Sequence, residues 1–206
     1  MDLAASLKNS VTTMALATVI AWIYLVIVRL AWKVPWREGA RRAGLTIGAR
    51  RPWIWAFVLL PPLLLYTYLT YSVAAPTPAD VTSPYHPMLG RGLTGEVLLA
   101  SLGYGLLASG WGEELVFRGL IAGALGRRWS LPSANLIQAA IFLAPHLLIL
   151  LVKPSAWPLL PGVFALALMT GWLRLRSGSI GPGLLLHGLG NSFVGVLASG
   201  ALPLPN

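Results

Sequence analysis

The sequence predicts an all-α membrane protein, a polytopic bundle of about six transmembrane helices. Of its 206 residues, 56% are hydrophobic and only 10% are charged, a balance that the surface of a water-soluble domain does not tolerate. The apolar residues gather into runs close to the ~20 residues that a helix needs to cross a bilayer. We expect one integral membrane domain over residues 1–206, with helices near residues 11–30, 52–71, 95–125, 131–152, 156–173 and 180–202.

The first run follows a short N-terminus without a clear cleavage site, which predicts a retained helix rather than a signal peptide. The third run is too long for a perpendicular crossing, so we expect a tilted helix centred near Glu113. Pro145 should kink the fourth helix. The connection after the second run, AAPTPADVTSPYHP, is too polar and too broken for a helix. It is expected to be a linker, with a substrate-gating loop as the alternative.

Basic residues separate the connections into two classes and predict the orientation. The second and fourth connections hold only Arg91 and Lys153, whereas the odd-numbered connections are rich in arginine. By the positive-inside rule the odd connections face the cytoplasm, which places both termini outside, in the inner or plasma membrane of the cell. The basic residues of the odd connections are Lys33, Arg37, Arg41, Arg42, Arg50, Arg51, Arg127, Arg128, Arg174 and Arg176.

Charge and cysteine content exclude several classes of function. The net charge of +9 would suggest a nucleic-acid partner for a soluble domain, but these arginines lie between apolar runs and report topology. We therefore expect a lipid bilayer and no nucleic acid. The chain has no cysteine, so disulfides, thiolate nucleophiles and cysteine metal sites are excluded.

Ionisable residues inside the apolar runs are the candidates for function, because each costs at least about 2.5 kcal/mol at mid-bilayer. Glu114 and Arg118 are spaced i, i+4 and can pair on one helix face, while Glu113 is rotated by about 100° and points elsewhere. This spacing predicts one structural acid and one acid free for chemistry. The alternative is a charge-neutral cluster that only helps helices to dock.

Two further i, i+4 pairs occur on other helices. Phe142 precedes His146 by one turn in the fourth helix, and His187 precedes Asn191 in the sixth. Each pair taken alone is explained by polar contacts between helices. Three such sites at similar depth on three helices favour a shared function.

A glutamate, two histidines and an asparagine in a low-dielectric site can activate water and stabilise an oxyanion, as amide hydrolysis requires. Other hydrolase designs are absent: there is no HExxH motif, no GxSxG motif, and the only aspartates are Asp2 and Asp80. Serine catalysis through Ser109 stays open, although its neighbours in the sequence form no supporting pattern.

Three ordered motifs, EExxxR from Glu113, FxxxH ending at His146 and HxxxN from His187, resemble those of the CAAX protease and bacteriocin-processing (CPBP) intramembrane proteases. This family includes the type II CAAX prenyl endopeptidases. The resemblance covers about residues 95–198, the expected protease region. It implies an intramembrane endopeptidase in which Glu113 and His146 activate the attacking water and His187 and Asn191 stabilise the oxyanion. Glu114 and Arg118 would orient the site.

The family has been described as glutamate-dependent and as metal-dependent, so zinc held by Glu113, His146 and His187 is the alternative to a cofactor-free site. An asparagine one turn from His187 suits an oxyanion site better than a ligand set, and we favour the metal-free version. The substrate would be a membrane-associated protein or peptide: a prenylated tail, a peptide precursor or a C-terminal anchor. Competing functions are a noncatalytic immunity or chaperone protein and a proton-relay transporter, which predicts broken helices in two repeated halves that the sequence lacks.

Overall fold

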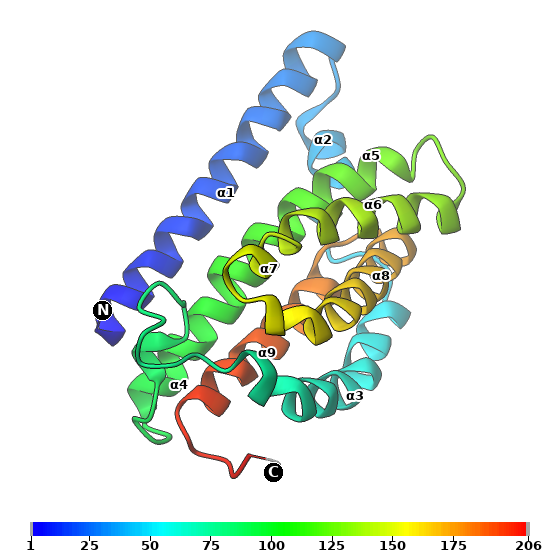
Figure 1. The fold of residues 1–206 in the computed structure, drawn as a ribbon. Helices are drawn as coiled ribbons and strands as arrows, with labels where there is room; N and C mark the ends of the chain where they lie inside the picture. The colour runs from blue at the N-terminus through cyan, green and yellow to red at the C-terminus, as the bar shows by residue number, and fades with distance from the viewer. Residues whose placement is uncertain (1, 205–206) are drawn as a thin grey trace.

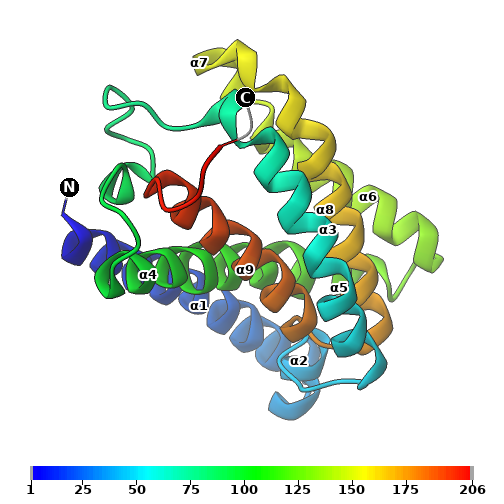
Figure 2. The ribbon, with the colours of Figure 1, turned by 90° about the horizontal axis from the view of Figure 1, so that it is seen from below.

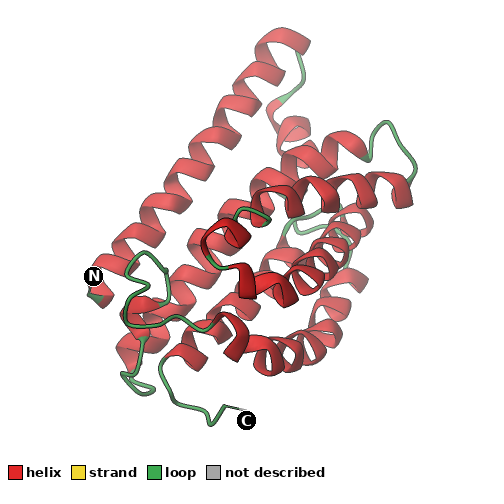
Figure 3. Cartoon of the chain, viewed as in Figure 1, coloured by secondary structure: helices red, strands yellow, loops and turns green. Residues whose placement is uncertain are grey.

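A computed structural model describes residues 2–204, and all of its regular elements are helical (Figures 1 and 3). The α-helices are α1 (Leu3–Trp32), α2 (Trp36–Arg42), α3 (Arg51–Ala74), α4 (Gly95–Leu102), α5 (Gly123–Leu125), α6 (Leu131–His146), α7 (Ile149–Val152), α8 (Leu160–Ser177) and α9 (Gly181–Ala198). The remaining helical elements are η1 (His86–Met88), η2 (Gly103–Trp111), η3 (Glu114–Ala122) and η4 (Pro154–Leu159).

The predicted fold class, an all-α membrane bundle, is confirmed. Among the described residues, four helices are long and apolar enough to cross a membrane: Leu3–Trp32, Arg51–Val73, Leu131–Val152 and Pro154–Ser177. Six crossings are not confirmed. The other two expected segments, residues 95–125 and α9, are helical and carry most of the polar motif residues in their apolar sequence.

Local sequence explains where several helices begin and end. The carboxylate of Asp2 accepts a hydrogen bond from Ala5 N–H at 2.6 Å, and Thr94 caps α4 in the same way through Val97 N–H. Pro145 lies one residue before the end of α6 at His146, and the chain is helical again from Ile149. The predicted disturbance of the fourth helix is therefore a break rather than a simple kink.

One end of the bundle, which we call the arginine-rich end, is formed by the connections 33–50, 126–130 and 178–180 (Figures 1 and 2). Its first and last connections are joined, since Ile180 N–H donates to Gly44 O and Ala49 N–H donates to Ser177 O. Arg174 also donates to Arg42 O at 2.8 Å. Gly44 has a φ of 75°, a left-handed conformation that favours glycine.

The opposite end, which we call the loop end, contains connections 75–94 and 153–159 together with the starts of α1 and α4 and the end of α9. A buried cluster joins α1, α3, connection 75–94, α4 and α9 through Leu3, Tyr71, Met88, Val97 and Ala198. Figures 1 and 2 show α2 far from both termini, which lie toward the loop end. The chain therefore traverses the bundle between its two ends once in each of the six expected segments.

The centre of the bundle is a close contact between η2 and α9. Gly105 and Gly110 on η2 face Gly188 on α9, and a Cβ added at Gly105 would collide with Gly188 O and with the Ser192 side chain. Both η2 and η3 are π-helical, a wide geometry with i→i+5 hydrogen bonds that is frequent at functional sites. This packing brings the EExxxR and HxxxN segments into direct contact.

Candidate active site

Glu114 is fixed between two partners inside the bundle. Its Oε1 lies 3.2 Å from Arg118 Nη1 and 3.0 Å from His187 Nδ1, and the side chains of Glu114 and Arg118 are both fully buried. The Arg118 guanidinium also lies 4.0 Å above the centre of the Phe142 ring, where a cation–π contact compensates part of its desolvation. Glu114 and Arg118, spaced i, i+4, therefore form the contact that the sequence predicts. The same contacts reach α9 through His187 and α6 through Phe142.

Glu113 points in a different direction from its neighbour. Its side chain is 32% exposed, and it borders a cavity in the bundle, whereas Glu114 has no exposure. Glu113 Oε2 lies 3.9 Å from His187 Nε2. One glutamate is thus buried against an arginine and the other reaches open space, as the 100° rotation between adjacent helical residues predicts.

Ser109, which the sequence left open as a nucleophile, occupies the centre of the polar set, a position that its neighbours along the chain did not indicate. Its hydroxyl donates to Glu113 Oε1 at 3.1 Å, accepts from Asn191 Nδ2 at 2.6 Å and lies 3.3 Å from His187 Nε2. The signal available in the sequence was the i, i+4 spacing of Ser109 and Glu113. The partners from α9 could not be read from the neighbourhood of Ser109 along the chain.

The number of donors and acceptors on each group limits which hydrogen bonds can form together. A serine hydroxyl has one donor and two acceptor sites, and Ser109 uses its donor on Glu113. All three bonds form together when His187 Nε2–H and Asn191 Nδ2–H both donate to the serine oxygen. His187 Nδ1–H then donates to Glu114. His187 therefore links Glu114 and Ser109 through its two ring nitrogens.

His146 reaches the same cavity from α6. Its Nδ1 lies 2.7 Å from Phe142 O, and because a carbonyl only accepts, this nitrogen carries the hydrogen. In the neutral imidazole, the Nε2 atom then has a lone pair. The Phe142 ring, which is almost fully buried, lies between the two imidazoles, with centroid distances of 4.5 Å to His146 and 6.0 Å to His187. Phe142 therefore separates and orients the two histidines.

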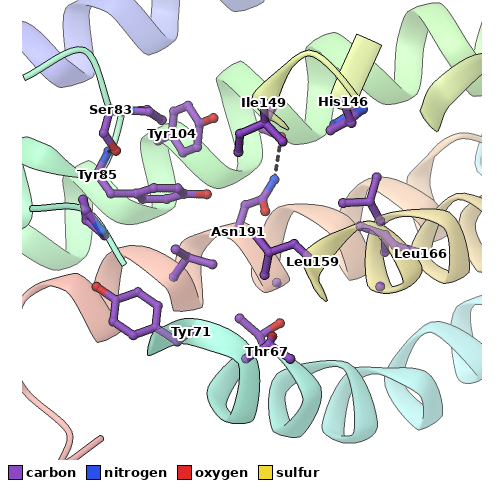
Figure 4. Close-up of a pocket in the computed structure, with 18 of the residues that line it drawn as sticks. Thr67, Tyr71, Ser83, Tyr85, Tyr104, His146, Ile149, Leu159, Leu166 and Asn191 are labelled. Atoms are coloured by element: carbon purple, nitrogen blue, oxygen red, sulfur yellow. Dashed lines mark hydrogen bonds between the residues drawn. The ribbon is translucent and has the colours of Figure 1, made fainter. Parts of the chain in front are cut away.

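The cavity has a volume of about 650 Å³, and its lining includes Tyr71, Ser83, Tyr104 and Asn191 (Figure 4). Its walls come from α3, α6, α8 and α9, and connection 75–94 contributes Tyr85, whose ring packs edge-on against Tyr104 at 5.1 Å. Burial, with the neighbouring Tyr104 as a smaller cause, raises the pKa of Tyr85 well above its ordinary value and keeps the phenol neutral. The connection expected to be a linker thus forms part of the cavity wall.

A second, smaller cleft of about 340 Å³ lies on the α1 side of Glu113. It is bordered by Thr13 and Ala17 of α1 and by Gly112, and it shares Ser109 and Glu113 with the main cavity. Glu113 therefore borders both spaces. His187 and Asn191 line the main cavity only.

A zinc ion would require its expected ligands, Glu113, His146 and His187, to converge on one point. Across residues 2–204, no three His, Cys, Asp or Glu side chains converge in a way that would hold a metal ion. His187 uses Nδ1 on Glu114, and His146 uses Nδ1 on Phe142 O. These bonds leave Nε2 of both histidines available, as in metal-bound histidines, so the cofactor requirement stays a prediction.

The buried polar set and the apolar helices together define an integral membrane protein with an ionisable site inside its bundle. A family model described as "Type II CAAX prenyl endopeptidase Rce1-like" matches residues 95–193. This match confirms the resemblance seen in the three motifs. It indicates an intramembrane endopeptidase of the CAAX-protease type with a peptide substrate. No curated protein and no solved structure matches the chain.

Proposed function

We propose that this protein is an intramembrane endopeptidase that hydrolyses a peptide bond with water activated by Glu113 and His146. The observation that supports this most strongly is the division between the two glutamates. Glu114 is fully buried against Arg118 and His187, whereas Glu113 lines a cavity with a side chain that is 32% exposed. A carboxylate that borders a cavity in an apolar bundle is suited to accept a proton.

In the proposed reaction, Glu113 removes a proton from water while the His146 Nε2 lone pair helps to orient it. The water oxygen forms a bond to the carbonyl carbon of the substrate, and the carbonyl oxygen becomes an oxyanion. His187 and Asn191 donate hydrogen bonds to that oxyanion. The carbon–nitrogen bond then breaks, the proton held by Glu113 passes to the leaving nitrogen, and the products are a new carboxylate and a new amine.

Asn191→Ala should lower kcat by about 100-fold to 1,000-fold with little change in KM, because the lost hydrogen bond acts chiefly in the transition state. Steady-state kinetics on the purified protein measure both constants. Val194→Ala is the matched control, since Val194 lies on the same helix and lines the same cavity without a polar group. Full activity in Asn191→Ala would remove the oxyanion assignment.

A second mechanism, in which Ser109 is the nucleophile, is favoured by one observation. The Ser109 hydroxyl donates to Glu113, accepts a hydrogen bond from Asn191 and lies within hydrogen-bond distance of His187 Nε2. Glu113 would then remove the proton of Ser109, whose oxygen would attack the carbonyl carbon and form an acyl-enzyme. Water would release the acyl group in a second step.

Ser109→Ala separates the two mechanisms. With water as nucleophile, Ser109 is a positioning residue, and its loss should cost about tenfold in kcat, the effect of one hydrogen bond of ordinary strength. With serine as nucleophile, activity should vanish, and the wild-type protein should form a covalent Ser109 adduct with a fluorophosphonate, detected by mass spectrometry. We expect the tenfold loss and no adduct. Ser101→Ala is the control, since its buried hydroxyl has no hydrogen-bond partner within residues 2–204.

A further inference from the structure

We propose that Arg127 and Arg174 bind a phosphate group at the arginine-rich end of the bundle, and that the headgroup of an anionic phospholipid supplies it. The site lies where α2, α5 and the end of α8 meet, and α2 and α5 lie side by side there (Figure 1). Neither arginine takes part in the proposed peptide hydrolysis. The site would tie the protein to the surface of the bilayer, whatever the chemistry inside the bundle.

Arg174 is a buried guanidinium that lacks an anionic partner. The residue is only 6% exposed, and its Nη2 donates to Arg42 O, a neutral acceptor, at 2.8 Å. Its Nε is buried and has no hydrogen-bond partner within residues 2–204. No carboxylate of those residues lies within ion-pair distance of Arg174. A buried charge without a partner is costly, so this guanidinium is suited to receive an anion.

A second guanidinium lies beside the first because Gly123 has no side chain. A Cβ added at Gly123 would lie 3.0 Å from Arg174 Nη2 and 3.6 Å from Arg127 Nη1. Arg127 Nη1 also donates to Gly123 O at 2.6 Å, which holds this side chain at the start of α5. Two like charges at one glycine repel each other. A phosphate between them would remove the repulsion, and its oxygens match the planar donors of two guanidinium groups.

The chain offers no acid to this pair. Glu38 is the only acidic residue in or beside the connections of the arginine-rich end, which hold 11 of the 15 Lys and Arg residues. Both Glu38 oxygens are already bonded, Oε2 to Arg41 Nε at 2.6 Å and Oε1 to Arg42 Nε at 2.9 Å. The anion that pairs with Arg127 and Arg174 therefore comes from outside the chain.

Exposed tryptophans place the two arginines at the depth of lipid headgroups. Trp32 ends α1 and Trp36 begins α2, and Trp129 follows Arg127 by two residues. All three indoles are exposed, and tryptophan is enriched where a membrane protein passes through the interface between hydrocarbon and water. Basic pockets between transmembrane helices at this depth bind the headgroups of anionic phospholipids. The surroundings therefore favour a lipid phosphate over a phosphate dissolved in water.

Native mass spectrometry of the full-length protein in detergent, titrated with phosphatidylglycerol, counts the bound lipids and gives their dissociation constants. Arg127→Gln removes one guanidinium of the pair. Arg128→Gln is the matched control, since it removes the same charge from the next residue, which is also exposed. We expect Arg127→Gln to weaken the tightest phosphatidylglycerol site by about 10-fold to 100-fold, the effect of losing charged hydrogen bonds. Arg128→Gln should change it little, because salt at about 0.15 M screens an exposed charge.

Arg174→Lys tests the buried member of the pair. Lysine keeps the charge but removes the planar donors, so the affinity for phosphatidylglycerol should again fall by about tenfold or more. Thermal unfolding without added lipid reports whether each variant is folded, and the exposed position of Arg127 keeps the test valid if Arg174→Lys is unstable. Equal affinity in the wild type and Arg127→Gln overturns the proposal. An equal loss in Arg127→Gln and Arg128→Gln also overturns it, since net charge alone would then attract the lipid.

Inorganic phosphate distinguishes the two sources of the phosphate group. The unfolding midpoint of the wild-type protein is measured with phosphatidylglycerol, with the neutral lipid phosphatidylcholine, and with inorganic phosphate at equal ionic strength. Phosphatidylglycerol should raise the midpoint most, and this rise should disappear in Arg127→Gln, because a ligand stabilises the state that binds it. A rise with inorganic phosphate that matches the lipid and depends on Arg127 would assign the site to a soluble phosphate and overturn the lipid assignment.

Discussion

Glu113→Gln is expected to lower the rate of peptide cleavage by about 100-fold to 10,000-fold, the range that general-base catalysis contributes. The amide keeps the shape of the side chain and can still accept the Ser109 hydrogen bond, but it cannot take a proton from water. Because Glu113 is 32% exposed and borders open space, the folded protein should reach its normal abundance. The loss should therefore appear in kcat and not in the yield of purified protein.

Glu96→Gln provides the matched control for that result. Glu96 is an exposed residue in the first turn of α4, far along the same helical segment from the site. It should keep full activity and full abundance. Cleavage by Glu113→Gln at the wild-type rate would eliminate Glu113 as the base, and a collapse in its abundance would make it a structural acid like its neighbour.

Glu114→Gln is expected to reduce stability by about 3–5 kcal/mol, the usual cost of removing one partner from a buried ion pair. Arg118 is fully buried, and among the described residues Glu114 is its only carboxylate within ion-pair distance. The variant would leave the guanidinium without that partner and would weaken the bond to His187 Nδ1. Thermal unfolding of the protein in detergent should show a clearly lower midpoint.

The control for the second glutamate is Glu38→Gln. Glu38 also pairs with arginines at i, i+3 and i, i+4 spacing, with Arg41 and Arg42, but on the surface. Hydrogen bonds from Arg42 and Arg41 lower the pKa of Glu38, yet an exposed pair of this kind contributes little to stability because water screens it. An unchanged midpoint for Glu114→Gln, equal to that of Glu38→Gln, would contradict the structural assignment.

Much of the arrangement could be predicted from the sequence because helical spacing is a local property. The pairing of Glu114 with Arg118, the divergence of Glu113, and the positions of His146 and Asn191 were all predicted from α-helical spacing. The pairing forms even though η3 is π-helical. The order of the motifs along apolar runs then led to the family, which the match over residues 95–193 confirms. The roles of these residues in catalysis stay predictions.

The features that were missed depend on contacts between segments distant in the sequence. Ser109 is central only because Gly105 and Gly188 let η2 approach α9 closely enough to place Asn191 and His187 on its hydroxyl. The π-helical geometry of η2 and η3 has no simple periodic signature in a run this apolar. Connection 75–94 looked like a linker because its packing partner, Tyr104, lies on another helix.

The central claim, that this protein cleaves peptide bonds with Glu113 as the base, is tested most directly by one comparison. Membranes from cells that produce the wild-type protein or Glu113→Gln at equal abundance are analysed for protein N-termini by quantitative mass spectrometry. We predict at least one membrane protein with a new N-terminus in the wild-type sample that is missing, or reduced at least about 100-fold, with the variant. Identical sets of N-termini in the two samples would contradict the claim.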